Sequence, residues 1–222
     1  MLTYSRLREK GFRVRGIERS AGLGGVWLTS CYPGARTDSE QPYYQILDKD
    51  LIDGWTWSER FPSQREVIDY FGYVDSRWQI SKEYDFSTEV IGARLDVKNT
   101  IWNVTLSDGR IVTTRWFVCA VGFASQISVP SLLQNERFQG QMYHSAQWPK
   151  SQAFDWKNKT VSVIGTGASG ISIIHEIAST VKHLTVYQQS PVVAFPKISA
   201  VESPGDRAVS YTHLTLPTKR IV

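Results

Sequence analysis

Residues that build metal sites and disulfide frameworks are scarce in this sequence. Its 222 residues include two cysteines and four histidines, and Cys31 and Cys119 stand far apart with no Cys-x-x-Cys or Cys-x-x-His spacing. Spacings of that kind mark metal sites, and regularly spaced cysteines in short secreted chains mark disulfide frameworks. We therefore expect neither a bound metal nor a disulfide, and we expect the reducing cytoplasm as the location.

Long apolar runs and charge of a single sign are missing as well. The longest apolar runs, residues 116–121 and 161–164, are much shorter than the roughly 20 residues of a membrane-spanning helix. The 25 basic and 21 acidic residues are interspersed, and the formal net charge is only +4. The sequence therefore predicts no membrane span and no nucleic-acid partner.

A glycine-rich turn is present in the setting of a dinucleotide-binding unit. Residues 160–164 predict a β-branched strand, residues 169–180 a helix and residues 183–187 a second strand. The first glycine permits a tight turn, the second lets the backbone approach a pyrophosphate, and the third lets helix and strand pack closely. An ordinary glycine-rich turn is the alternative, but the flanking strands and helix favour a cofactor site. The predicted cofactor-binding residues of this turn are Gly165, Thr166, Gly167, Ala168, Ser169 and Gly170.

The N-terminal residues predict part of a second unit of the same kind. A helix is expected over residues 2–10 and a strand over residues 12–18, which ends in Glu18. An acid at the end of the second strand binds the ribose of a dinucleotide, whereas the alternative is a solvent-exposed acid at a strand end. In the intact unit Gln188, at the end of the second strand, lies 23 residues after Gly165. The same spacing counted back from Glu18 places the first phosphate loop before Met1.

Between the two units, five residues follow a Phe-x-Gly-x-x-x-His-x-x-x-Trp-Pro pattern: Phe138, Gly140, His144, Trp148 and Pro149. This pattern resembles the fingerprint of type I Baeyer–Villiger monooxygenases, which belong to the flavin-containing monooxygenase superfamily. Ordinary packing roles for the histidine and tryptophan are the alternative, and the glycine-rich turn that follows argues against them. The resemblance extends to about residue 200 and includes Gly24-Gly25-Val26-Trp27, Tyr32-Pro33-Gly34-Ala35-Arg36-Thr37-Asp38 and Trp57-Ser58-Glu59-Arg60.

The resemblance implies an α/β flavoprotein with two dinucleotide-binding domains, built from Rossmann-like parallel sheets with a small antiparallel insert and incomplete at both ends. It implies FAD and NADP as cofactors, and a ketone and O2 as substrates of the parent enzyme. In this family NADPH reduces FAD, and one oxygen atom of O2 then enters a ketone to give an ester or lactone. An N- or S-oxygenating flavin monooxygenase is the alternative function, and a catalytically inactive truncated gene product is a second alternative.

Site residues are carried over from the resemblance position by position. Asp38 and Arg36 are the implied catalytic residues, and Asp38 is expected to orient an arginine farther along the parent chain. His144 and Trp148 are implied to couple the two domains as a linker rather than to transfer protons. Residues implied on the FAD side are Glu18, Gly24, Gly25, Val26, Trp27, Asp38, Tyr44, Val90, Ala120 and Gly122, and those implied on the nicotinamide side are Arg36, Thr37, Asp38 and Gln64. Gln189 and Ser190 are implied near the 2′-phosphate of NADP.

One position departs from the family pattern. The family usually has Gln-Arg-Thr-Pro after the second strand, whereas this chain has Gln188-Gln189-Ser190-Pro191. The missing guanidinium would grip the 2′-phosphate of NADPH with two hydrogen bonds. The preference for NADPH over NADH is therefore weakened. NADP remains the first choice because Gln189 does not repel a phosphate and Lys182 or Lys197 can supply a positive charge.

The expected layout has three parts. Residues 1–145 form an FAD-binding domain without its first strand and phosphate loop, residues 146–208 begin an NADP-binding domain, and residues 209–222 resemble a translated sequencing adapter, with a natural tail as the alternative. Further expected elements are a helix over 64–78, a hairpin of strands 102–106 and 110–114, and a strand over 117–119.

Overall fold

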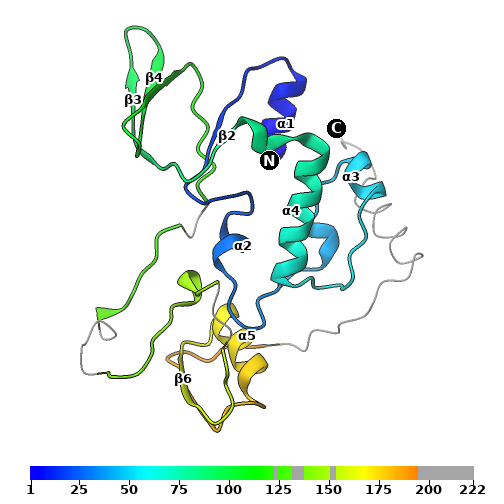
Figure 1. Ribbon diagram of the computed structural model, residues 1–222, viewed down its shortest axis with the longest axis vertical. Helices are drawn as coiled ribbons and strands as arrows, with labels where there is room; N and C mark the ends of the chain where they lie inside the picture. The colour runs from blue at the N-terminus through cyan, green and yellow to red at the C-terminus, as the bar shows by residue number, and fades with distance from the viewer. Residues whose placement is uncertain (123–124, 132–137, 151–153, 195–222) are drawn as a thin grey trace, which may run out of the picture. The chain divides into compact units, whose positions relative to one another are not determined.

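The computed structural model describes residues 1–122, 125–131, 138–150 and 154–194, which form parts of two compact units (Figure 1). The first unit contains residues 1–29 and 71–147, and the second contains residues 30–70 and 148–222. The chain therefore passes between them three times, at residues 29–30, 70–71 and 147–148. The tail predicted at 209–222 lies outside the described residues.

The first unit combines a short parallel strand pair with a three-stranded antiparallel sheet. Its order is α1 (Leu2–Glu9), β1 (Gly16–Ile17), α2 (Val26–Thr29), the second half of α4 (Gln64–Trp78), η2 (Ile80–Glu83), β2 (Tyr84–Asp85), β3 (Val90–Asp96), β4 (Ile101–Leu106), β5 (Ile111–Thr114) and η4 (Ser145–Gln147). The predicted N-terminal helix is confirmed.

Strand β1 lies parallel to β2, with Gly16 opposite Tyr84. A glycine is required there because a Cβ atom would collide with the Tyr84 ring. The strand predicted over residues 12–18 is therefore found only as Gly16–Ile17. Strand β2 has only two residues, so it pairs with the C-terminal end of the predicted strand and leaves residues 12–15 without a neighbouring strand among the described residues.

The antiparallel sheet has the order β3-β4-β5 and confirms the predicted hairpin. Its turn closes through a hydrogen bond from Gly109 N to Leu106 O at 3.0 Å, and Gly109 adopts a φ of 87° that favours glycine. The prediction of a strand at 117–119 is wrong, because these residues form no strand in the structure. Phe117 and Val118 favour a strand, but an extended segment becomes one only where a neighbouring strand pairs with it.

The second unit contains the intact βαβ segment. Its elements are η1 (Gln41–Tyr43), α3 (Lys49–Asp53), the first half of α4, β6 (Thr160–Ile164), α5 (Ala168–Ile177) and β7 (His183–Tyr187). Strands β6 and β7 pair in parallel, with Val161 opposite Leu184. Both strands and α4 have the predicted bounds, and α5 ends three residues before the predicted Thr180.

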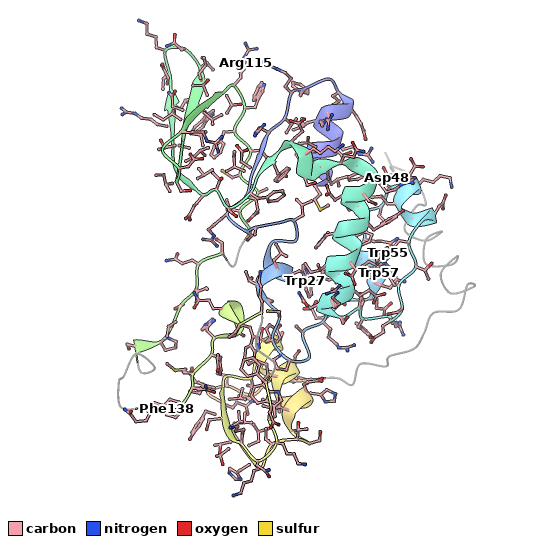
Figure 2. All side chains as sticks on the ribbon, in the orientation of Figure 1. Trp27, Asp48, Trp55, Trp57, Arg115 and Phe138 are labelled. Carbon is pink, nitrogen blue, oxygen red and sulfur yellow. The ribbon has the colours of Figure 1, made fainter. Side chains whose placement is uncertain are left out.

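An aromatic core holds the 30–70 part of the second unit together. The ring centroids of Trp57 and Tyr70 are 4.9 Å apart, and Trp55 lies 5.6 Å from Trp57 (Figure 2). Trp57 Nε1 donates to Gln45 Oε1 at 2.8 Å, and Ile46 N donates to the Tyr70 hydroxyl at 2.8 Å. The polar atoms of Trp57 and Tyr70 thus find partners while the rings exclude water. None of the helices in the described ranges combines the length and apolar character needed to cross a membrane.

Candidate cofactor-binding and catalytic site

The glycine-rich turn joins β6 to α5 in the predicted manner. Gly165 adopts a φ of 95°, which turns the chain sharply at the end of the strand. Gly167 is the N-cap of α5 with extended backbone and no side-chain cap. A Cβ at Gly170 would collide with the carbonyl oxygen of Gly165, so only glycine allows the first helical turn to pack this closely on the turn.

The turn leaves open space where a phosphate would approach. A Cβ added at Gly165 or Gly167 would meet no atom within 4 Å. The first N–H groups of a helix have no partner within the helix, and with the helix dipole they attract anions. The residues of the turn therefore fit the pyrophosphate of a dinucleotide.

A hydrogen bond ties the end of β7 to this turn. Gln188 Nε2 donates to Thr166 Oγ1 at 2.9 Å. Gln189 and Ser190 follow as exposed residues. Sequence reasoning missed Gln188 as a site residue, although its place after the second strand is the one that Glu18 takes after β1.

Arg36 and Thr37 are fixed by their neighbours in the second unit. Arg36 Nη1 forms an ion pair with Glu59 Oε2 at 2.8 Å and donates to the Phe61 carbonyl at 3.2 Å. Thr37 is fully buried, its N–H donates to Pro62 O at 3.0 Å, and its hydroxyl donates to Ser39 O at 2.9 Å. Nη1 of the Arg36 guanidinium is therefore held in place by Glu59 and Phe61.

Asp38 follows these fixed residues and is exposed. Its Oδ1 accepts a hydrogen bond from Ser39 Oγ at 3.2 Å. Burial, and after it the charges of Asp38 and Tyr32, raise the pKa of Tyr44. Gln64 N donates to Ala35 O at 2.8 Å, so Gln64 lies beside the segment that contains Arg36, Thr37 and Asp38.

The first unit holds the predicted ribose acid at the end of its parallel pair. Glu18 N donates to Asp85 O at 2.9 Å, and Thr88 N donates to Glu18 O at 3.1 Å. The Glu18 carboxylate accepts from Ser20 N at 2.7 Å through Oε1. An ionised carboxylate has about four acceptor positions, so capacity remains for ribose hydroxyls.

The Gly24-Gly25 turn begins the short helix α2. Both glycines have positive φ, 133° and 54°, and Val26 and Trp27 follow as the first helical residues (Figure 2). Helix α2 lies against η4, which belongs to the Phe138–Pro149 fingerprint. Other predicted FAD-side residues of this unit are Val90, at the start of β3, and the exposed Ala120 and Gly122.

The first half of the fingerprint is held within the first unit. His144 Nδ1 accepts a hydrogen bond from Ala146 N at 3.1 Å, and His144 O accepts from Gln147 N at 2.9 Å. The His144 imidazole therefore caps the N-terminal end of η4. Phe138 is exposed, and its ring lies where a Cβ of Gly140 would be (Figure 2).

The second half of the fingerprint is held within the second unit. Trp148 is 9% exposed, and its ring lies 5.1 Å from Phe154 and 6.2 Å from Trp156 between centroids. Its carbonyl accepts a hydrogen bond from Cys31 Sγ at 3.5 Å. Pro149 follows as a half-buried residue. The fingerprint is thus anchored on both sides of the point where the chain leaves one unit for the other.

A glycine turn at a helix N-terminus and an acid at the end of a second parallel pair are the features expected of two dinucleotide-binding units. The chain belongs to the L-lysine 6-monooxygenase/L-ornithine 5-monooxygenase family, whose model matches residues 44–202.

Curated relatives are similar over most of this chain. FAD-binding monooxygenase lolF2 of Epichloe uncinata is 45% identical over 89% of the chain and 36% of its own length. Acetone monooxygenase (methyl acetate-forming) of Gordonia sp. (strain TY-5) is 36% identical over 91% of the chain and 38% of its own length. Phenazine N-monooxygenase PhzNO1 of Lysobacter antibioticus is 36% identical over 93% of the chain and 37% of its own length. The chain thus spans little more than a third of the length of these relatives.

Solved structures give the same fold. The crystal structure of OTEMO in complex with FAD and NADP superimposes with a TM-score of 0.87 at 33% identity, over 95% of this chain and 41% of that one. The predicted resemblance to Baeyer–Villiger monooxygenases and the predicted α/β flavoprotein fold are confirmed.

Proposed function

We propose that the complete protein containing this chain is an FAD-dependent, NAD(P)H-using monooxygenase that inserts one oxygen atom of O2 into a ketone to give an ester or lactone. The fingerprint carries this proposal. His144 is fixed in one compact unit and Trp148 in the other, as a linker between two dinucleotide domains requires. The similarity to acetone monooxygenase (methyl acetate-forming) supports the ketone as substrate class.

The residues of this chain have distinct proposed tasks. The turn from Gly165 to Gly170 holds the pyrophosphate of NADP, and Glu18 holds the ribose of FAD. FAD, when bound, supplies the electron transfer and oxygen activation. Asp38 presents a fixed negative charge to the nicotinamide side, and Arg36 keeps the backbone before it in place through Glu59.

The domain boundaries stay part of the proposal. An FAD-binding domain over residues 1–145 and an NADP-binding domain from residue 146 are supported by the passage between units at residues 147–148. Residues 30–70, however, pack in the second unit, although the proposal assigns them to the FAD-binding domain. A cytoplasmic location is supported by the fact that neither Cys31 nor Cys119 forms a disulfide.

Product analysis tests the proposal. The complete enzyme should oxidise NADPH in a ketone-dependent way and yield an ester or lactone from members of a panel of cyclic and linear ketones. A parallel panel of amines and sulfides serves as the comparison. N- or S-oxides without any ester would assign the protein to the alternative class, and NADPH oxidation that no substrate stimulates would contradict both.

The alternative function is oxygenation of nitrogen. It is favoured by the family model, which describes L-lysine and L-ornithine monooxygenases, and by the similarity to phenazine N-monooxygenase PhzNO1. Both classes place the same cofactors on the same fold, so the substrate panel decides between them.

Replacing Gln189 with arginine should raise the preference for NADPH. Gln189 is exposed just after β7, where a guanidinium would form two hydrogen bonds to a 2′-phosphate that NADH lacks. We expect KM for NADPH to fall about tenfold, which corresponds to about 1.4 kcal/mol, and KM for NADH to stay within about twofold. Steady-state kinetics with both coenzymes measure the ratio. Gln79→Arg, on an exposed residue of the first unit, is the matched control, and an equal fall for both coenzymes would contradict this role.

A further inference from the structure

A hydroxyl pair joins the Tyr32 segment to the phosphate-binding helix. Ser169 Oγ, in the first turn of α5, donates to the Tyr32 hydroxyl at 3.0 Å, although 137 residues separate the two in sequence. Ser169 lies within the Gly165–Gly170 turn, so the Tyr32 hydroxyl contacts the helix end that would hold the pyrophosphate. Both residues belong to the second unit.

The backbone after Tyr32 turns tightly against the same helix. Ala35 N donates to Tyr32 O at 3.1 Å, and Pro33 and Gly34 are the two central residues of this turn. Gly34 has a φ of 72°, which suits the second central position of a type II turn after proline. A Cβ at Gly34 would lie 2.6 Å from the Ser172 carbonyl oxygen, so glycine allows this close approach to α5.

A short backbone ladder then leads from the turn to Asp38. Ala35 O accepts from Gln64 N at 2.8 Å, and Thr37 N donates to Pro62 O at 3.0 Å. Residues 35–37 are thereby fixed immediately before Asp38.

From this geometry we infer that Tyr32 is a positioning residue. It fixes the segment that carries Asp38 to the first turn of α5 through Ser169, so that the affinity for NADP and the placement of Asp38 depend on one hydroxyl pair. This inference rests on the proposed function, because it takes the Gly165–Gly170 turn as the pyrophosphate site.

Tyrosine suits this task better than a flexible side chain. Its ring has two rotatable bonds and a polar tip, so a contact through the hydroxyl costs little side-chain entropy. A hydroxyl pair of this kind contributes a modest net free energy, which corresponds to about a threefold to tenfold change in an equilibrium constant. An effect of that size on cofactor binding is measurable although the fold does not depend on it.

A double-mutant cycle in the complete enzyme tests the inference. Tyr32→Phe and Ser169→Ala should each raise Kd for NADP⁺ about threefold to tenfold, measured by calorimetric titration. Each should also lower kcat at saturating NADPH, because Asp38 is less well placed. The double variant should bind NADP⁺ no more weakly than the weaker single variant, since both substitutions remove the same bond. Ser169→Thr, which keeps a hydroxyl, should restore binding.

Several outcomes would overturn the inference that Tyr32 is a positioning residue. Additive losses would mean that Ser169 acts on the cofactor without Tyr32, and a wild-type Kd in Tyr32→Phe would remove its role. A lowered Tm with unchanged Kd would assign Tyr32 to stability alone. Tyr43→Phe, on a tyrosine that is 71% exposed, is the control and should change nothing. Because NADP⁺ binding is read without turnover, absence of ester from every ketone would refute the proposed function and still leave this cycle decisive.

Discussion

Asp38→Asn in the complete enzyme should lower kcat/KM for a ketone by about a hundredfold to a thousandfold. The substitution removes a negative charge and keeps the shape of the side chain. A fixed charge near a reacting centre contributes most when the groups that carry it are already in place, so that no reorganisation is needed. The ladder before Asp38, formed by Thr37 with Pro62 and by Ala35 with Gln64, supplies that fixed position.

Stability should not change with this substitution. Asp38 is exposed, and the hydroxyl of Ser39 can still donate to the amide oxygen of an asparagine. We therefore expect the Tm and the FAD content of Asp38→Asn to equal those of the wild type. Steady-state kinetics, thermal unfolding and flavin absorbance measure the three quantities.

The matched control is Asp53→Asn in α3. Asp53 forms an exposed ion pair with Lys49, and exposed pairs of this kind contribute little to stability. It should leave kcat/KM at the wild-type value. Equal activity of Asp38→Asn and the control would show that Asp38 has no catalytic task, and a lowered FAD content in Asp38→Asn would assign it to cofactor retention instead.

The sequence predicted best those parts of the fold whose signals are local. The β-branched run before Gly165, the amphipathic pattern of α4 and the Ser107-Asp108-Gly109 turn each specify an element from adjacent residues, and all three elements are found. The spacing of the three glycines also has a local cause, since Gly165 and Gly170 meet within one turn.

Features that depend on distant partners were predicted poorly. The strand expected at 117–119 and the first half of the strand expected at 12–18 had suitable composition, but pairing decides whether a segment becomes a strand. The hydrogen bonds from Gln188 to Thr166 and from Ser169 to Tyr32 span 22 and 137 positions. No pattern of composition or spacing reveals such contacts, because they arise only when the chain has folded.

Two alanine substitutions in the glycine-rich turn should have different effects on stability and similar effects on cofactor binding. At Gly170 an added Cβ collides with the backbone oxygen of Gly165, which has no rotamer by which to move away. Overpacking of this kind costs about 1–3 kcal/mol. At Gly167 the backbone has a φ of −67° and a Cβ meets nothing within 4 Å. Alanine restricts the unfolded chain by about 0.4–1 kcal/mol, but it is a poorer N-cap than glycine. The two effects oppose each other, so Gly167→Ala should change the stability of the cofactor-free protein little.

Both substitutions should weaken NADP⁺ binding, but for different physical reasons. In Gly170→Ala the helix end must move away from the turn, whereas in Gly167→Ala the methyl group occupies the open space that the pyrophosphate would enter. We expect Kd for NADP⁺ to rise at least about tenfold in both variants, or about 1.4 kcal/mol each, measured by titration beside thermal unfolding without cofactor. Gly72→Ala, in the middle of α4 with no atom within 4 Å of the new Cβ, is the control that changes stability alone. If Gly167→Ala bound NADP⁺ as tightly as Gly72→Ala, the open space at the turn would not be where the pyrophosphate lies, because no bound phosphate would tolerate a methyl group between it and the backbone N–H groups.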